Sequence, residues 1–349
     1  MIRKNSRKEG RTLEIIRVGI MLPDKMFAGA LVRGLSRECR NMTFLLEQPE
    51  YADLILTDEV CPQEYQKDRY LYLVNEPSRA EERVDLVFRY EDCRSIVNRL
   101  THLYYLLTGR NLEYRGTTAF RVISFLGEAG GCGVTSLCLS VGRMLSILYG
   151  CHCLYLSLTP LDGSGQYVGY SEGGDLQRLF YQLEAEKEVP LGAHLLSDGY
   201  LDRLRVPMLN HYLTEIDGQV LASLMETVNR MGQYEYVLID IGTMYAGGVI
   251  DLLRNSDGYV FVRNGSRYME EERADHLIGT LGISETKGIR VRNMVRGKEE
   301  TYDDEMQIRY CRQAFVWRDG RIEIDLNTSY GSEVAMLCER ILGEYDNGK

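Results

Sequence analysis

The sequence lacks several features that would place it in a specialised class. Its nine cysteines contain no C-x-x-C pair, and Cys151-His152-Cys153 has no second cluster to complete a metal site. The cysteines therefore indicate buried, reduced thiols. No apolar run approaches the ~20 residues of a membrane span, because Glu128 and Arg143 interrupt the best candidate. Internal repeats and low-complexity tracts are missing too. From the reduced thiols and the lack of a membrane-spanning run we expect a soluble, cytoplasmic protein.

A strongly positive charge is also missing. The formal net charge is −10, and the surplus of acidic residues lies after residue 117. This balance argues against binding DNA or an anionic membrane through the overall field. The first twelve residues are basic and polar and lack the apolar core of a secretion signal, so we expect residues 1–14 to form a tail. The 349 residues, 44% of them hydrophobic, suffice for about two domains.

Residues 15–108 alternate between strand-like and helical patterns. Apolar, strand-like runs occur at 15–22, 42–46, 52–58, 70–74 and 84–88. Helical patterns follow at 27–39 and 91–107. This alternation predicts a small, parallel α/β domain. Residues 109–118 are polar and aperiodic, and they predict a linker to a second domain at 119–349.

The segment ADLILTDE in this first domain resembles the third strand of a response-regulator receiver domain. The resemblance places Asp58 at the phosphoacceptor position. Receivers have a pair of acids after their first strand and a lysine after their last, whereas this chain has Asp24 and Arg89 there. Runs 42–46 and 52–58 also lie too close for the crossover helix of a parallel pair. We therefore expect a degenerate receiver used for docking or dimerisation, although Asp58 could equally be a solvated carboxylate at a strand end.

The second domain begins with a strand, a glycine-rich turn and a helix. Residues 121–126 are apolar and β-like, and 135–149 form an almost wholly apolar helical segment. This order is that of a phosphate-binding loop, in which backbone N–H groups and the helix N-terminus attract anions. In an active loop a lysine precedes the hydroxyl residue, and here that position holds valine. The candidate residues are Gly130, Gly131, Cys132, Gly133, Val134, Thr135 and Ser136.

Strands and helices alternate through the remainder of the chain and predict a doubly wound, mostly parallel α/β sheet. The strand at 236–240 ends in Asp240 after a run of apolar residues. Thr135 and Asp240 would together form a Mg²⁺ site for a bound nucleotide. The other predicted strands are 153–158, 258–263 and 289–295, and the predicted helices are 176–186, 220–231, 270–281 and 332–342.

The order GGxGxTS, YLSLTP, YEYVLIDIG, DGYVFVRNGS, RNMV resembles the MinD/ParA family of deviant P-loop ATPases. With a receiver-like domain in front, the chain is similar to the TadZ/CpaE branch, which places Flp (Tad) pilus assembly at the cell pole. The resemblance implies a P-loop NTPase fold, a homodimer, and protein partners in a pilus or polar assembly system. It also implies that ATP or ADP binds with Mg²⁺, and that Asn293 faces adenine.

The departures from the family affect catalysis. The signature lysine falls at Ala129 and the loop lysine at Val134, and Ser157 and Thr159 stand where active members carry aspartates. Phosphoryl transfer depends on positioning and on neutralising charge. We therefore expect a localisation or assembly scaffold with slow or absent hydrolysis. The alternatives are an active ATPase with nucleotide-dependent dimerisation, a receiver-type signalling protein, or a loop that is only a tight turn.

A basic cluster surrounds Asn293, but acidic residues follow it at once. Its members are Lys287, Arg290, Arg292, Arg296 and Lys298, and the acids are Glu299, Glu300, Asp303, Asp304 and Glu305. A self-satisfied, solvated edge is expected here in preference to a DNA-binding patch. The acidic ending CERILGEYDNGK lacks an amphipathic, basic helix, so no direct membrane anchor is expected.

Overall fold

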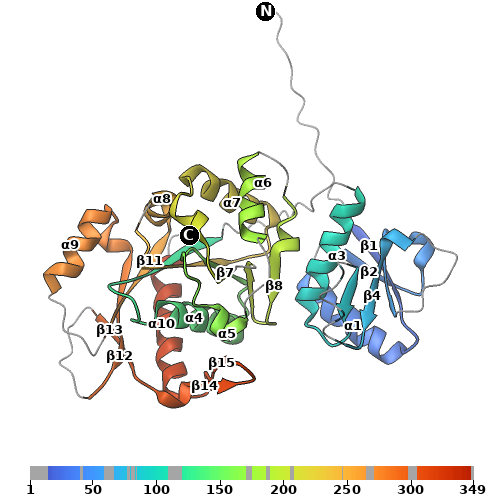
Figure 1. The fold of residues 1–349 in the computed structure, drawn as a ribbon. Coiled ribbons are helices and arrows are strands. Elements are labelled where there is room, and N and C mark those ends of the chain that lie inside the picture. The colour runs from blue at the N-terminus through green and yellow to red at the C-terminus, as the bar shows by residue number, and fades with distance from the viewer. Residues whose placement is uncertain are drawn as a thin grey trace, which may run out of the picture. The chain divides into compact units, whose positions relative to one another are not determined.

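The structure is a computed structural model, and contacts between Cα atoms divide the chain into two compact units, Met1–Tyr114 and Arg115–Lys349. Each unit is described by itself (Figure 1). The residues described are 15–39, 42–58, 67–76, 79, 83, 85–108, 120–169, 175–185, 189–204, 208–245, 247–264, 271–297 and 305–346. The predicted tail at 1–14 and the whole predicted linker at 109–118 lie outside these residues.

The first unit contains a parallel sheet whose strand order, within the described residues, is β2-β1-β3-β4-β5. This is the order of flavodoxin-like doubly wound folds, in which ligands bind where the order reverses, between β1 and β3. Residues Leu54 to Thr57 of β3 are all buried, as expected for a central strand covered on both faces. The elements are β1 Ile16–Met21, α1 Lys25–Glu38, β2 Met42–Leu46, β3 Leu54–Asp58, β4 Tyr70–Val74, β5 Leu86–Phe88 and α3 Cys93–Thr108.

The connection between β2 and β3 corrects one sequence argument. We expected a connection this short to be incompatible with parallel pairing. The structure shows β2 and β3 on opposite sides of β1, each parallel to it. A 3-10 helix, η1 (Pro49–Tyr51), makes the crossover. The argument was wrong because the two strands do not pair with each other and because a short 3-10 helix is enough to pass β1.

The second unit is built on a mostly parallel sheet that confirms the predicted doubly wound class. Its described strands lie in the order β13-β12-β11-β6-β10-β7-β9-β8, and β8 runs antiparallel to β9. A separate hairpin joins β14 to β15. The strands are β6 Arg121–Gly127, β7 Cys153–Ser157, β8 Leu195–Ser197, β9 Leu201–Leu204, β10 Tyr236–Gly242, β11 Gly258–Asn264, β12 Gly288–Val295, β13 Glu305–Arg309, β14 Phe315–Arg318 and β15 Arg321–Ile324.

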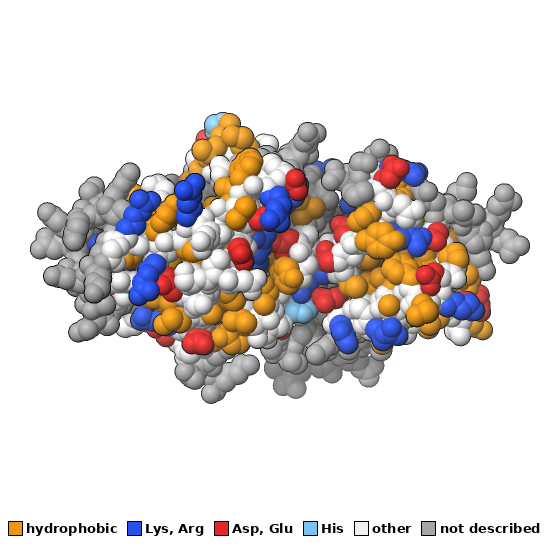
Figure 2. All heavy atoms as spheres, turned by 90° about the horizontal axis from the view of Figure 1, so that it is seen from below, with side chains coloured by type: hydrophobic (Ala, Val, Ile, Leu, Met, Phe, Trp, Pro, Cys, Tyr) orange, Lys and Arg blue, Asp and Glu red, His pale blue; other side chains and the backbone are white. Residues whose placement is uncertain are grey.

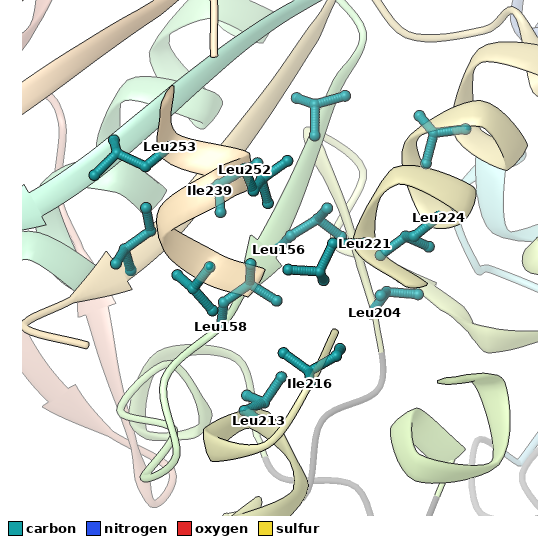
Figure 3. Packing of buried hydrophobic residues seen from close by; sticks show 14 of the residues in the cluster. Leu156, Leu158, Leu204, Leu213, Ile216, Leu221, Leu224, Ile239, Leu252 and Leu253 are labelled. Carbon is teal, nitrogen blue, oxygen red and sulfur yellow. The ribbon is translucent and has the colours of Figure 1, made fainter. Parts of the chain in front are cut away.

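Helices cover both faces of this sheet and create two hydrophobic clusters. On one face, Leu156 and Ile239 of the sheet pack with Leu221 of α7 and Leu252 of α8 (Figure 3). On the other face, α4 is sandwiched between the sheet and α10, and the hairpin packs there too. The helices are α4 Val134–Tyr149, α5 Gly165–Val168, α6 Asp175–Glu184, α7 Gly218–Met231, α8 Gly247–Asn255, α9 Glu271–Leu281 and α10 Ser329–Asp346.

The predicted elements are present within a few residues of their predicted bounds, but the nine-residue helix α8 and several short strands were missed. The missed strands β8, β9, β13, β14 and β15 have three to five residues each. Runs this short carry too few alternations to be recognised. Among the described helices, none is long and apolar enough to cross a membrane.

Candidate functional site

The glycine-rich loop between β6 and α4 has the backbone conformation that its sequence demands. Gly131 and Gly133 both adopt left-handed conformations, with φ of 80° and 86°. A Cβ added to Gly133 would lie 2.4 Å from Nδ2 of Asn293, so a larger residue cannot fit. A Cβ added to Gly130 or Gly131 would meet no heavy atom within 4 Å. The loop is therefore packed tightly behind Gly133 and open at Gly130 and Gly131.

Asn293 on β12 holds the loop from behind. Its Nδ2 donates a hydrogen bond of 2.9 Å to the carbonyl oxygen of Cys132, and the Asn293 side chain is buried. A trans peptide directs its C=O and N–H to opposite sides. Because the carbonyl of Cys132 points at Asn293, the N–H of Gly133 points away from Asn293. The structure thus assigns Asn293 to positioning the loop, while contact with adenine stays a prediction.

A second contact fixes the start of the loop. Glu128 accepts a hydrogen bond of 3.1 Å from Nε of Arg263 on β11, and Nη1 of Arg263 lies 3.2 Å from Glu305 on β13. All three side chains are buried. Removing one member of a buried ion pair costs about 3–5 kcal/mol because its partner is left uncompensated. No local pattern in the sequence indicates this network, which joins residues far apart in the chain.

The lysine position of the loop is part of the hydrophobic core. Val134 is 6% exposed and packs in the cluster under α4. The neighbouring Ala129, at the position of the signature lysine, is likewise uncharged. The loop therefore offers backbone N–H groups and hydroxyls to an anion, with no cation from these two positions.

Thr135 and Asp240 lie close to each other. The Thr135 hydroxyl is near enough to lower the pKa of the Asp240 carboxyl. Asp240 lies near the carboxyl end of the central strand β10, between β6 and β7, and is fully buried. It also accepts hydrogen bonds of 3.0 Å from the Tyr155 hydroxyl and from the backbone N–H of Gly242. These bonds hold the carboxylate at the first turn of α4.

Burial raises the pKa of Asp240 from 3.8 to about 6, because water no longer stabilises its charged form. The hydroxyls of Thr135 and Tyr155 oppose this shift, and the negative charge of Asp162 adds to it. A buried carboxylate is destabilised by the loss of its hydration, and a bound cation would offset part of this unfavourable free energy. The site is therefore electrostatically prepared for a cation.

Asp162 is a site residue that the sequence reasoning missed. It is buried, and its carboxylate accepts hydrogen bonds from the backbone N–H and hydroxyl of Ser164, at 3.1 and 2.8 Å. A Cβ added to the next residue, Gly163, would lie 3.7 Å from Oγ1 of Thr135. The available signal was an acid shortly after the YLSLTP segment, whose Ser157 and Thr159 hydroxyls bond to each other at 3.0 Å.

The residues present fit a magnesium ion. Mg²⁺ binds hard oxygen ligands, keeps several waters, and is usually held by one or two protein groups together with phosphate oxygens. Thr135 and Asp240 supply such oxygens beside the open part of the loop. In the described part of the chain, no group of three or more His, Cys, Asp or Glu side chains could hold a metal ion. Phosphate and water would therefore complete the coordination.

In the first unit, Asp58 at the end of β3 pairs with Arg89, which follows β5. Both side chains are about one quarter exposed or less. Asp24 accepts hydrogen bonds from the backbone N–H groups of Met26 and Phe27 and so caps α1. Asp58 is thus an ion-paired carboxylate and not a freely solvated one. Its phosphorylation, and the receiver-like fold, remain predictions.

The basic cluster around Asn293 is largely neutralised by the chain itself. Arg290 lies 2.5 Å from Asp275, and Arg292 lies 2.7 Å from Glu305. The guanidinium of Arg296 stacks over the Tyr310 ring at 4.2 Å. The remaining acids of the predicted edge, at 299–304, and Lys298 lie outside the described residues.

No protein-family model matches the sequence, and a search of curated proteins found no match. Solved structures do match. A plasmid partition protein from Borrelia burgdorferi B31 bound to AMPPNP is 15% identical, with a TM-score of 0.50 over 65% of this chain and 100% of that chain. A cobyrinic acid a,c-diamide synthase from Mycobacterium smegmatis with a bound ATP analogue and magnesium is 13% identical, with a TM-score of 0.49 over 66% and 97%. The MinD cell division protein of Aquifex aeolicus is 19% identical, with a TM-score of 0.46 over 64% and 97%.

The Borrelia match, which reaches a TM-score of 0.50, shows the fold. The second unit, which holds about two thirds of the residues, has the doubly wound fold of P-loop NTPases of the ParA/MinD type. The predicted fold class is thereby confirmed. At this level of identity the match concerns the fold, and the ligands named for these proteins belong to them.

Proposed function

We propose that the second unit binds ATP or ADP with Mg²⁺, weakly and with little hydrolysis. The phosphates would lie against Gly130–Ser136, and Mg²⁺ would lie beside Thr135 and Asp240. The observation that carries this proposal is the fully buried Asp240, whose pKa the nearby Thr135 hydroxyl lowers, together with a loop that is open at Gly130 and Gly131. Because the hydroxyl and the carboxylate already lie close together, little reorganisation is needed to place a cation there.

Little hydrolysis follows from the groups that are missing. Acceleration of phosphoryl transfer requires positive charge on the oxygens of the transferred group. Val134 and Ala129 supply none, and Ser157 and Thr159 cannot act as carboxylates. Backbone N–H groups and the helix N-terminus remain, and they attract phosphates. Groups that bind the substrate and the transition state equally well do not lower the barrier to reaction.

We further propose that the protein is a localisation or assembly scaffold of the TadZ/CpaE type. It would act as a homodimer in the cytoplasm, with protein partners of a pilus or polar assembly system. The support is the sequence resemblance together with the ParA/MinD-type fold. A degenerate receiver at residues 15–108 would serve docking or dimerisation, since Asp58 is already paired with Arg89.

Isothermal titration of the purified chain with ATP and ADP, with and without Mg²⁺, tests nucleotide binding. We expect Mg²⁺-dependent binding that is lost in Asp240→Ala, with phosphate release close to background. Light scattering of the same samples measures dimerisation. Steady turnover that disappears in Asp240→Ala would replace the scaffold with the alternative, an active ATPase. Absence of any binding would leave the loop as a tight turn.

The assembly role needs a separate test in cells. A fluorescent fusion should form polar foci, and deletion of the gene should remove surface pili. A diffuse fusion that complements the deletion would contradict the polar role. Unchanged piliation after deletion would contradict the pilus role while leaving nucleotide binding untouched.

A further inference from the structure

The β14–β15 hairpin (Phe315–Ile324) is connected to the first turn of α4 by two chains of contacts, one to each of its strands. The hairpin lies on the α4 face of the sheet, and its register pairs Phe315 with Ile324 and Trp317 with Ile322. Phe315 and Ile324 pack on the core, whereas Trp317 is 67% exposed and Val316 is 40% exposed. The hairpin therefore has one end in the core and the other in solvent.

The first connection runs through α5 to β15. The Ser136 hydroxyl donates a hydrogen bond of 3.0 Å to the carbonyl oxygen of Gly133, and it lies close enough to Tyr167 of α5 to lower the pKa of that phenol. Directly after α5, a Cβ added to Gly169 would lie 2.9 Å from Nη2 of Arg321 on β15. The backbone of Gly169 is thus in close contact with this arginine. A movement of Ser136 reaches β15 through these contacts.

The second connection runs through α10 to β14. The Ser140 hydroxyl donates a hydrogen bond of 2.7 Å to the carbonyl oxygen of Ser136, and Tyr330 of α10 donates one of 2.9 Å to the Ser140 hydroxyl. The Tyr330 ring packs edge to face against Phe315, with centroids 5.1 Å apart. Ser140 and Tyr330 are buried, so water cannot replace a broken bond. Leaving such a group unpaired costs about 1–3 kcal/mol.

We propose that the β14–β15 hairpin is a nucleotide-sensitive surface element, whose packing changes when phosphates occupy the loop Gly130–Ser136. This inference rests on the proposed nucleotide binding and adds a readout to it. Phosphates bind the backbone at the N-terminal turn of α4, the turn to which Ser136 belongs. Because both connections start at Ser136 and end on opposite strands, a shift of this turn repacks the hairpin as a unit.

The solvent-exposed part of the hairpin would transmit this repacking to the surface of the molecule. Trp317 and Val316 lie beside the exposed Arg318 and Arg321. Figure 2 views the molecule from below in Figure 1, the side that carries the hairpin, and shows hydrophobic side chains interspersed with Lys and Arg on this face. Binding of phosphates to the loop Gly130–Ser136 would thus alter a surface that carries both hydrophobic and charged side chains.

The single tryptophan of the chain makes the proposal directly measurable. Titration of the full-length protein with ATP and Mg²⁺ should produce a saturable change in Trp317 emission, with the midpoint found by calorimetry on the same sample. Tyr330→Phe should abolish the emission change while nucleotide still binds. Tyr234→Phe is the matched control, because it removes another buried tyrosine hydroxyl, bonded to Asp202 at 2.9 Å on the opposite face. The control should keep the emission change.

The outcomes separate this inference from the proposed function. Calorimetric binding without a change in emission would overturn the coupling and leave nucleotide binding standing. Absence of binding would overturn both. A change in emission that persists in Tyr330→Phe would exclude the α10 connection. Hydrogen exchange without nucleotide provides a further test. The hairpin amides should exchange faster in Tyr330→Phe than in Tyr234→Phe. Equal exchange rates in the two variants would contradict the α10 connection.

Discussion

Asn293 donates a hydrogen bond to the carbonyl oxygen of Cys132, which lies 161 residues earlier in the chain. This bond joins β12 to the glycine-rich loop and turns the N–H of Gly133 away from Asn293. The resemblance alone suggested a different task for Asn293, contact with adenine. The hydrogen bond shows that the residue shapes the loop before any ligand is considered.

Asn293→Ala should therefore destabilise the protein and weaken nucleotide binding together. The carbonyl of Cys132 would lose its buried donor, which costs about 1–3 kcal/mol. Urea unfolding measures the first effect and calorimetry the second. A loss of nucleotide affinity with no change in the unfolding free energy would instead support a direct contact with the nucleotide.

Alanine substitutions at two glycines should separate loop folding from ligand binding. Gly133→Ala forces a left-handed residue with a Cβ against Asn293, so we expect a destabilisation of at least about 1 kcal/mol. Gly130→Ala places its methyl group in open space, where phosphates are proposed to lie, and should lower nucleotide affinity with little change in stability. Equal nucleotide affinity in wild type and Gly130→Ala would argue against this loop as the phosphate site.

Val134→Lys should tighten nucleotide binding. A hydrogen bond to a charged group contributes about 1.5–3 kcal/mol, equivalent to roughly 10- to 100-fold in the dissociation constant. Removal of the buried valine should lower the unfolding free energy by about 1–2 kcal/mol. Val134→Met controls for side-chain length without charge. Equal affinities of the Lys and Met variants would contradict a phosphate at this position.

The pH dependence of stability should reflect Asp240. Its pKa is about 6 in the folded protein and 3.8 for an unperturbed carboxyl group, so the folded state binds the extra proton between these values. Stability should consequently fall as pH rises from about 4 to about 6, by at most about 3 kcal/mol from this group. Urea unfolding at several pH values checks this. The slope should be smaller in Asp240→Asn, and identical slopes would refute the assignment.

Asp58 should resist phosphorylation by acetyl phosphate. Its charge is already neutralised by Arg89, and Asp24 is engaged in capping α1. Incubation with radiolabelled acetyl phosphate and Mg²⁺ should leave the protein unlabelled. Labelling that vanishes in Asp58→Ala would instead establish the receiver-type signalling alternative. A double-mutant cycle of Asp58→Ala and Arg89→Ala should give a coupling of about 0.5–1 kcal/mol, since the pair is partly exposed.

The sequence revealed those parts of the fold that depend on local patterns. Glycines before an apolar helix predicted the loop, and an acid after four apolar residues predicted the position of Asp240. Both follow from short-range chemistry, because parallel strands place their carboxyl ends at one edge of a sheet. Thr135 and Asp240 could thus be paired although they are far apart in the chain.

Other features depend on packing between distant segments and could not be predicted. The bond from Asn293 to Cys132 and the contact between Glu128 and Arg263 require the spatial order of β11, β12 and β6. Asp162 escaped notice because a connecting loop, and not a strand end, brings it beside Thr135. The hairpin strands were too short for their alternation to be recognised.

The burial of Val134 ties this side chain to the stability of the domain. A side chain packed among a helix, a sheet and a neighbouring turn contributes to folding independently of any ligand. A lysine at this position would therefore gain its charge only at the expense of a weakened interior.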